Sequence, residues 1–169
     1  MLDIYTLGED VLRKECSEVK VFDSALKMLA DAMLETLEEA DGVGLAGPQV
    51  GVSERIFVIH IPDNPPIVFV NPEIIQTSIE TSPYEEGCLS IPGVYCNVIR
   101  PSAVTIQAQD VTGKPFTLEA TGLLARAIQH ENDHLHGKLY IDLLSEKDRE
   151  KAVREYERRN RRHGGRRRK

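Results

Sequence analysis

The stretch that decides the fold is TGLLARAIQHENDHL, residues 121–135. Its apolar side chains recur at helical spacing, and a glycine follows at position 137, so the pattern predicts one helix over this stretch. In a helix, His130 and His134 lie one turn apart on the same face, where two imidazole nitrogens can reach one metal ion. Glu131 lies beside that face and can accept a proton from a water molecule held there. The stretch therefore predicts a helix that binds a catalytic metal ion.

The segments around this stretch predict short strands and two more helices. Apolar spacing predicts a helix over 23–40 with Asp23 or Ser24 as its N-cap, and a highly charged helix is expected to start at Ser145. The glycine-rich segment 42–51 predicts a loop or an irregular extended segment. β-rich runs separated by turn residues predict strands at Arg55–His60, Ile67–Asn71, Ile74–Ile79, Ala103–Gln109 and Pro115–Glu119. The predicted class is α+β, with short mixed or antiparallel sheets packed around the central metal-binding helix and with an N-terminal and a C-terminal helix.

The length of 169 residues predicts one globular domain over 1–163, followed by a basic, disordered tail over 164–169. No apolar run approaches the roughly 18–20 residues that span a bilayer, and the N-terminal segment lacks the features of a signal peptide. Three cysteines are too few for a disulfide framework and fit reduced thiols. We therefore expect a cytoplasmic protein with no membrane partner.

Charge is distributed unevenly along the chain. The net charge is −6, yet residues 149–169 carry eleven Lys and Arg against three Glu. This basic segment suits a polyanionic partner, such as nucleic acid or an anionic membrane surface, but basic runs are common, and a solvated tail that keeps the protein soluble is the more ordinary interpretation. Composition alone leaves both interpretations open.

A catalytic metal ion needs a third protein ligand besides the two histidines. The long zincin pattern fails, because position 140 is Tyr140 rather than histidine. Acidic residues further along the chain are also available: Asp142, Glu146 and Glu150. The better candidate is Cys88, because a thiolate is a stronger donor than a carboxylate and the neighbouring Gly87 lets the backbone approach closely. Taken alone, Cys88 fits a small buried apolar residue better than a ligand.

Three short motifs in one order resemble those of the peptide deformylase family, and the similarity extends over nearly the whole chain. The motifs are Gly42-Val-Gly-Leu-Ala-Gly-Pro-Gln49, Glu86-Gly-Cys-Leu-Ser90 and His130-Glu-Asn-Asp-His134. Each motif alone is weakly specific, whereas the ordered set is highly specific. Gly47 departs from the family, which usually has alanine there, and the missing methyl group predicts a looser backbone before Pro48.

The resemblance implies an enzyme that removes the N-formyl group from the N-terminal formylmethionine of newly made polypeptides and releases formate. It implies a metal site with a fourth position open to water and these ligands: Cys88, His130 and His134. It implies a base that takes the proton of the water and two donors to the formyl oxygen, namely Glu131, the Gln49 side chain and the Leu89 backbone N–H. The resemblance implies one divalent ion per chain, Fe²⁺ first, whereas the softness of the ligands alone suits Zn²⁺, Ni²⁺ or Co²⁺ as well.

The resemblance also implies how the peptide binds. Backbone groups near Gly44 and Gly87 are expected to bond to it as to an added strand. The methionine side chain is expected in a pocket formed by Val43, Leu123 and Ala127, although ordinary core packing explains these three residues equally well.

Two charged residues of the central helix have open roles. Arg126 can reach the substrate or extend to water. Asp133 needs a partner, for which we expect Arg100, or it orients the N–H of His134.

The family resemblance further implies docking of the basic C-terminal helix and tail on the ribosome, near the exit of the nascent chain. Two other functions remain open from the residues themselves. One is a metallopeptidase that cleaves internal peptide bonds. The other is a non-catalytic ribosome- or RNA-binding module with a structural metal, although such sites usually have four protein ligands and the sequence offers three.

Overall fold

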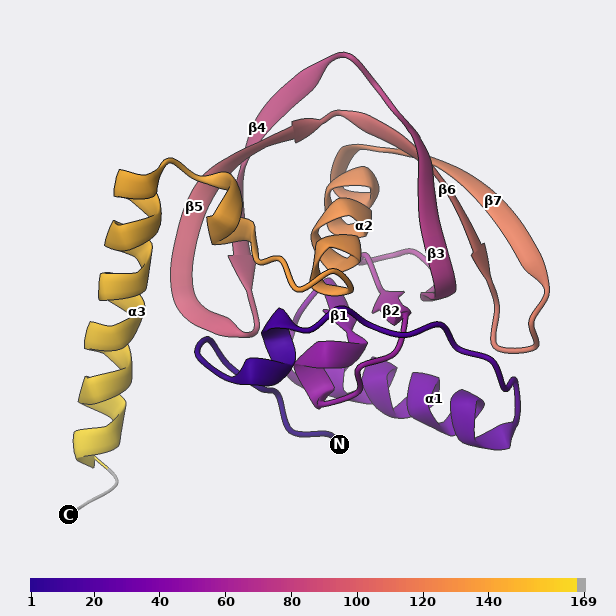
Figure 1. The fold of residues 1–169 in the computed structure, drawn as a ribbon, viewed down its shortest axis with the longest axis horizontal. Coiled ribbons are helices and arrows are strands. Elements are labelled where there is room, and N and C mark those ends of the chain that lie inside the picture. The colour runs from indigo at the N-terminus through magenta and orange to yellow at the C-terminus, as the bar shows by residue number, and fades with distance from the viewer. Residues whose placement is uncertain (167–169) are drawn as a thin grey trace.

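Two antiparallel sheets and three α-helices make up residues 1–166, the part of the chain that this computed structural model describes (Figure 1). The larger sheet has the order β1-β2-β3-β6-β7, with strands β1 (Gly44–Ala46), β2 (Ile56–Ile59), β3 (Ile67–Thr77), β6 (Ala103–Gln109) and β7 (Pro115–Thr121). The smaller sheet is the hairpin of β4 (Thr81–Cys88) and β5 (Ile91–Pro101). The helices are α1 (Ser24–Glu39), α2 (Gly122–His134) and α3 (Glu146–Arg166), and short 3₁₀ turns are η1 (Asp10–Arg13), η2 (Gly47–Val50) and η3 (Tyr140–Leu143). The predicted α+β class is confirmed.

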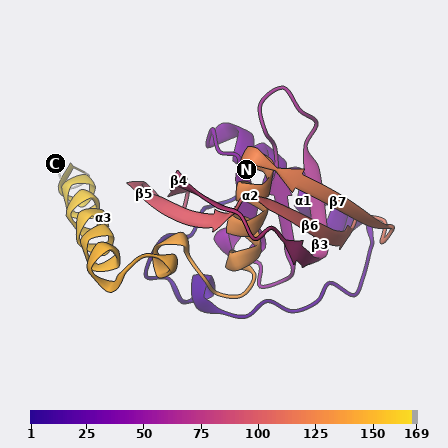
Figure 2. The same ribbon diagram turned by 90° about the horizontal axis from the view of Figure 1, so that it is seen from above.

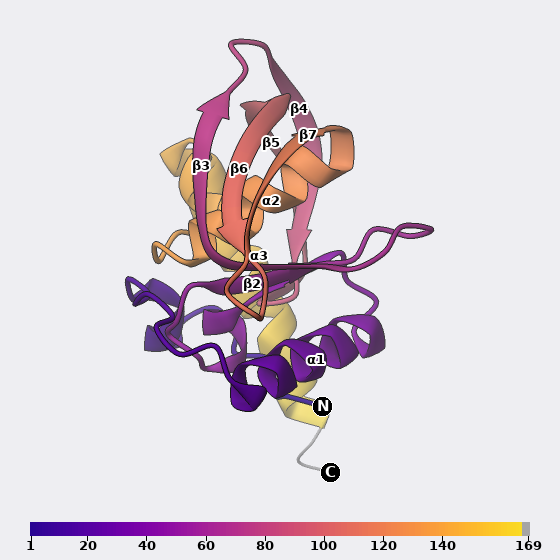
Figure 3. The same ribbon diagram turned by 90° about the vertical axis from the view of Figure 1, so that its right-hand side faces the viewer.

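Strand β2 lies in the core because both of its faces are covered. Successive side chains of a strand point to opposite faces, so Ile56 and Val58 pack with α1 while Phe57 and Ile59 pack with α2. All four residues are at most 1% exposed. Figure 3 shows α1 and α2 on opposite sides of β2. The two helices therefore cover β2 from both sides, which gives α2 its central position.

Strand β3 corrects the prediction of two separate strands. The chain continues as one strand through Asn71 and Pro72, and its register against β6 shifts between Val70 and Glu73. Pro72 has no N–H for the ladder, and Asn71 has a positive φ of 49°. A bulge absorbs both irregularities, so residues that suggested a break lie inside a bent strand.

The sequence does not predict the β4–β5 hairpin. Strand β4 contains the adjacent acidic residues Glu85 and Glu86 and a glycine, so it lacks the apolar alternation that indicates a strand. Pairing with β5 nevertheless runs from Thr81 to Cys88. Cys88 is therefore the last residue of a strand that the sequence analysis does not predict. Figure 2 shows the hairpin between α2 and α3.

Helix α3 packs on the hairpin side of the molecule through few residues. Ala152 and Tyr156 are buried in a cluster with residues of β5 and η3. The helix continues through Gly164 and Gly165, past the predicted domain boundary at 163. Glycine lowers helix propensity by about 1 kcal/mol, but it keeps its backbone N–H, so the helical hydrogen bonds can continue through it. Positions 167–169 of the predicted tail lie outside the described residues. Within residues 1–166, no helix has the length and apolar character needed to cross a membrane.

Candidate metal and active site

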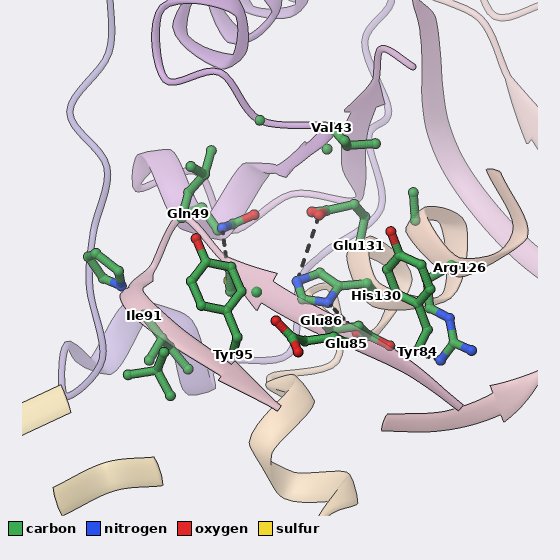
Figure 4. A pocket seen from close by; sticks show the side chains of 18 of the residues that line it. Val43, Gln49, Tyr84, Glu85, Glu86, Ile91, Tyr95, Arg126, His130 and Glu131 are labelled. Carbon is green, nitrogen blue, oxygen red and sulfur yellow. Dashed lines mark hydrogen bonds and ion pairs between the residues drawn. The ribbon is translucent and has the colours of Figure 1, made fainter. Parts of the chain in front are cut away.

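A cavity of about 420 Å³ opens between β1, the β4–β5 hairpin and α2 (Figure 4). Its wall contains nearly all of the site residues predicted from the sequence, which are Val43, Gly44, Gln49, Gly87, Cys88, Leu89, Leu123, Ala127, His130 and Glu131. The remaining predicted residue, His134, is buried and 1% exposed. The fold thus brings the three sequence motifs together around one cavity.

Three side chains place metal-ligating atoms close together. Cys88 offers Sγ from the end of β4, and His130 and His134 offer ring nitrogens from successive turns of α2. The three atoms lie within 4.8 Å of one another, and Cys88 Sγ is 3.5 Å from His134 Nε2. Tetrahedral ligands at about 2.0–2.3 Å from a metal lie roughly 3.4–3.7 Å apart, so the group fits one ion. Asp142, an alternative ligand by sequence, pairs with Arg13 instead.

Glu86 is a functional residue whose role the sequence does not indicate. Its Oε1 lies 2.8 Å from Nδ1 of His130, and Arg100 donates to the same carboxylate from Nε and Nη2 at 2.7 and 3.1 Å. Burial alone would raise the pKa of Glu86, but hydrogen bonds from His130 and Arg100 and their positive charges outweigh it and lower the pKa to about 2. The ionised carboxylate therefore fixes the His130 ring and leaves Nε2 available as a ligand.

The two histidines differ in their electrostatics. Burial disfavours a charge on His130, but hydrogen bonds with Cys88 and Glu86 and nearby negative charges raise its pKa well above the ordinary value. Burial, together with the positive charges of His130 and Arg100, lowers the pKa of His134 well below the ordinary value. Neutral imidazole is the form of histidine that binds metal ions, so the lowered pKa of His134 keeps its ring in that form.

Glu131 is a buried carboxyl next to the ligand group. It is 4% exposed, and its Oε1 lies 3.9 Å from Nε2 of His130 (Figure 4). Burial raises the pKa of Glu131 to about 7, against the opposing effect of the positive charges of His130 and Arg100. A pKa near neutrality lets a carboxyl both accept and return a proton. A Cβ at Gly44 would lie 2.8 Å from Glu131 Oε1, so only glycine leaves room for this side chain.

Gln49 is held in one orientation at the cavity wall. Its Oε1 accepts a hydrogen bond from the Ala46 N–H at 2.9 Å. Its Nε2 donates to Ser90 Oγ at 3.1 Å and lies 3.6 Å from Cys88 Sγ. Because the carbonyl end is fixed, the N–H end faces the ligand group. The backbone N–H of Leu89 follows Cys88 directly in the chain.

Two glycines of the motifs allow close packing. A Cβ at Gly47 would lie 2.7 Å from the carbonyl oxygen of Val52 and 2.9 Å from that of Glu54. This close backbone packing argues against the looser backbone that the missing methyl group predicted. A Cβ at Gly87 would lie 2.6 Å from the ring of Tyr95, so glycine lets this ring pack directly against the backbone.

The two charged residues with open roles now have partners. Asp133 accepts a hydrogen bond from Arg100 Nη1 at 2.8 Å, which confirms the expected partner. Within residues 1–166 the Nδ1 of His134 has no hydrogen-bond partner, so Asp133 does not orient it. Arg126 does not extend to water but is buried and donates to Glu86 at 3.0 Å.

The three residues predicted for the methionine pocket lie in the cavity wall with different exposure. Leu123 is 36% exposed, which core packing alone does not explain. Val43 is half-buried, and Ala127 is 8% exposed and also belongs to the main core cluster.

Comparison with known proteins gives one family. The family model for polypeptide deformylase matches residues 1–150. A peptide deformylase of Prochlorococcus marinus strain NATL1A is 46% identical over 151 residues, which cover 87% of this chain and 75% of the relative. Peptide deformylase 2 of Gloeobacter violaceus is 49% identical over 145 residues, or 83% of this chain and 78% of the relative.

Solved structures agree with the sequence comparison. The crystal structure of a peptide deformylase from Legionella pneumophila is 43% identical and has a TM-score of 0.92 over 97% of this chain and 98% of that one. A peptide deformylase from Synechococcus elongatus in complex with actinonin is 43% identical and has a TM-score of 0.85, covering 88% and 83%. These findings favour deformylation over the peptidase and binding-module alternatives. The chain belongs to the polypeptide deformylase family and removes the formyl group from an N-terminal methionine.

Proposed function

We propose that Cys88, His130 and His134 hold one divalent cation at which the formyl group is hydrolysed. The convergence of their three ligand atoms within 4.8 Å, beside a buried carboxyl in a cavity wall, carries this proposal. A bound cation supplies Lewis-acid polarisation of the formyl oxygen and a more acidic water. One thiolate and two imidazoles suit Fe²⁺, Zn²⁺, Ni²⁺ and Co²⁺, and we favour Fe²⁺.

Glu131 acts as the base in this proposal. It accepts a proton from the attacking water and returns one to the departing amine, which leaves formate and a free N-terminal methionine. Its burial and its pKa of about 7 support this assignment, since the group can exist in both protonation states near neutral pH.

Gln49 and Leu89 stabilise the charge that develops on the formyl oxygen. The fixed amide of Gln49 and the backbone N–H of Leu89 both lie at the wall beside Cys88. Donors held in place before the reaction cost no reorganisation, and the loss of one typically lowers the rate about 10²–10³-fold.

The peptide binds as an extended strand between Gly44 and Gly87. Both glycines line the cavity and keep its walls free of side chains at these points. The methionine side chain enters the apolar part of the cavity beside Val43, Leu123 and Ala127. The exposure of Leu123 supports a role in binding rather than in the core alone.

The C-terminal helix docks on the ribosome in this proposal. Arg154, Arg158, Arg161 and Arg162 are exposed on α3, and ribosomal RNA is a polyanion. Binding should therefore weaken steeply as salt increases. Newly made chains carry the substrate, so we place the protein in the bacterial cytoplasm.

An anaerobic assay of formate release from formyl-Met-Ala, with metal analysis of the same samples, tests the proposal. We expect about one metal ion per chain in the wild type. Cys88→Ser should lose metal and activity, whereas Glu131→Gln should keep metal and lose activity. Cys96→Ser is the matched control, because that thiol lies outside the ligand group. Full metal content and activity in Cys88→Ser would overturn the proposal, and cleavage of unblocked peptides would support the peptidase alternative.

A further inference from the structure

Arg126 is a buried cation that the proposed mechanism does not use. It is 7% exposed and lies on α2, one turn before His130. Taking a guanidinium out of water is costly unless it is paired and hydrogen-bonded. Its partners therefore show what the residue holds together.

The Arg126 guanidinium binds both strands of the β4–β5 hairpin. Its Nη1 donates to Oε2 of Glu86 at 3.0 Å and to the Val98 carbonyl at 2.9 Å. Its Nη2 donates to the Ser82 carbonyl at 2.7 Å. Glu86 and Ser82 belong to β4, whereas Val98 belongs to β5. One side chain of α2 thus fixes three points on the hairpin.

Glu86 is clamped between two residues of α2 that lie one turn apart. His130 contacts Oε1 of the carboxylate, and Arg126 contacts Oε2. Two residues further along β4, Cys88 ends the strand. The same strand therefore carries both the carboxylate held by Arg126 and the thiol of the ligand group.

The backbone of α2 packs closely on β1, β2 and β7, while its links to the hairpin are made by long side chains. Figure 4 shows Arg126 beside Tyr84, whose ring centroid is 5.5 Å from the guanidinium carbon. The separation between the two histidines on α2 and Cys88 on β4 thus depends on bridges such as that of Arg126.

We propose that Arg126 is a positioning residue that holds the β4–β5 hairpin, and with it Cys88, at the distance from α2 that a three-ligand metal site requires. This inference rests on the proposed metal function. A lysine keeps the charge but has one donor nitrogen in place of two, so it does not reproduce the bridge in which Nη1 binds Glu86 and Val98 while Nη2 binds Ser82.

The test measures metal binding rather than turnover. Metal-free protein is titrated with Co²⁺ against a chromophoric chelator, and the thiolate-to-Co²⁺ charge-transfer band is recorded. Substitution of groups that orient metal ligands typically lowers affinity about 10–100-fold, and we expect Arg126→Met to fall in this range with a weaker thiolate band. Arg126→Lys should lose less Co²⁺ affinity than Arg126→Met. Ser82→Ala should bind as the wild type does, because the carbonyl that accepts from Arg126 remains.

Leu26→Ala provides a control for general destabilisation, since Leu26 is buried on α1 away from the cavity. The inference is overturned if Arg126→Met binds Co²⁺ within about twofold of the wild type with an unchanged band, well short of the effect of an orienting group. It is also overturned if Leu26→Ala, at equal loss of Tm, weakens binding as much. If Arg126→Met fails to fold, Arg126→Lys is measured instead, and Co²⁺ binding within about twofold of the wild type with an unchanged band then overturns the inference. A wild-type protein without any thiolate band would instead refute the proposed metal function itself.

Discussion

Replacing Glu131 by glutamine should stabilise the metal-free protein, by an amount that depends on pH. The carboxyl is 4% exposed, and burial raises its pKa from 4.5 to about 7. A tenfold change in an acid dissociation constant corresponds to about 1.4 kcal/mol, so ionised Glu131 costs the folded state about 3 kcal/mol. Glutamine stays neutral at every pH and avoids this cost.

The sign follows from the two protonation equilibria of Glu131. Below pH 4.5 the carboxyl is protonated in both the folded and the unfolded chain, so its ionisation costs nothing there. Between pH 4.5 and about 7 the unfolded chain ionises first, and the stability of the wild type falls relative to that of Glu131→Gln. Above about pH 7 the difference reaches its full value.

Thermal unfolding of both proteins in the presence of a chelator, from pH 4 to pH 8.5, measures this difference. For a chain of this size about 3 kcal/mol corresponds to a gain in Tm of roughly 6–12 °C for Glu131→Gln, relative to its difference at low pH. Glu119→Gln is the matched control, because Glu119 is exposed on β7. A difference between Glu131→Gln and wild type that is independent of pH would refute the reasoning. Added Zn²⁺ should reduce the difference, since a nearby cation favours the carboxylate.

Three further substitutions test separate parts of the structure. Gly44→Ala should lower kcat about 10²-fold with little change in metal content, as measured by formate release and metal analysis. The reason is that the new methyl group would lie 2.8 Å from Glu131 Oε1 and displace the base. Gln49→Ala should lower kcat/KM by about 10²–10³ through loss of a fixed donor, and an unchanged value would remove Gln49 from the mechanism. Tyr140→Phe should destabilise the fold by about 1–3 kcal/mol in urea unfolding, since the hydroxyl donates to the Val94 carbonyl at 2.7 Å in a buried position.

The sequence predicts those features of the site that depend on local geometry. Two histidines four residues apart share a helix face whatever the rest of the fold does, and Asp23 caps α1 through a bond to Leu26 N at 3.1 Å. The central position of α2 also follows from its apolar residues. These features depend only on the spacing of residues along a helix, which can be read directly from the sequence.

The hairpin and its carboxylate depend on contacts between distant residues. Strand β4 has no apolar alternation, because Glu86 points inward to meet His130, 44 residues later. No local pattern indicates that such a glutamate is buried, because its burial depends on hydrogen bonds from Arg100 on β5 and Arg126 on α2. No local pattern indicates either that position 47 requires glycine, because the atoms that a side chain would meet there belong to the backbone of residues 52–54.

The charges around the cavity explain why a divalent cation suits it. The buried and half-buried carboxylates are Glu86, Glu131 and Asp133, and the facing guanidiniums are those of Arg100 and Arg126. With a Cys88 thiolate, the form that binds metal, the cluster has two negative charges in excess. Hydrogen bonds with Cys88 and Glu86, together with the nearby negative charges, raise the pKa of His130 well above its ordinary value, whereas burial raises the pKa of Glu131 to about 7. A divalent cation balances the same excess and leaves Glu131 ionised, which is the state that a base requires.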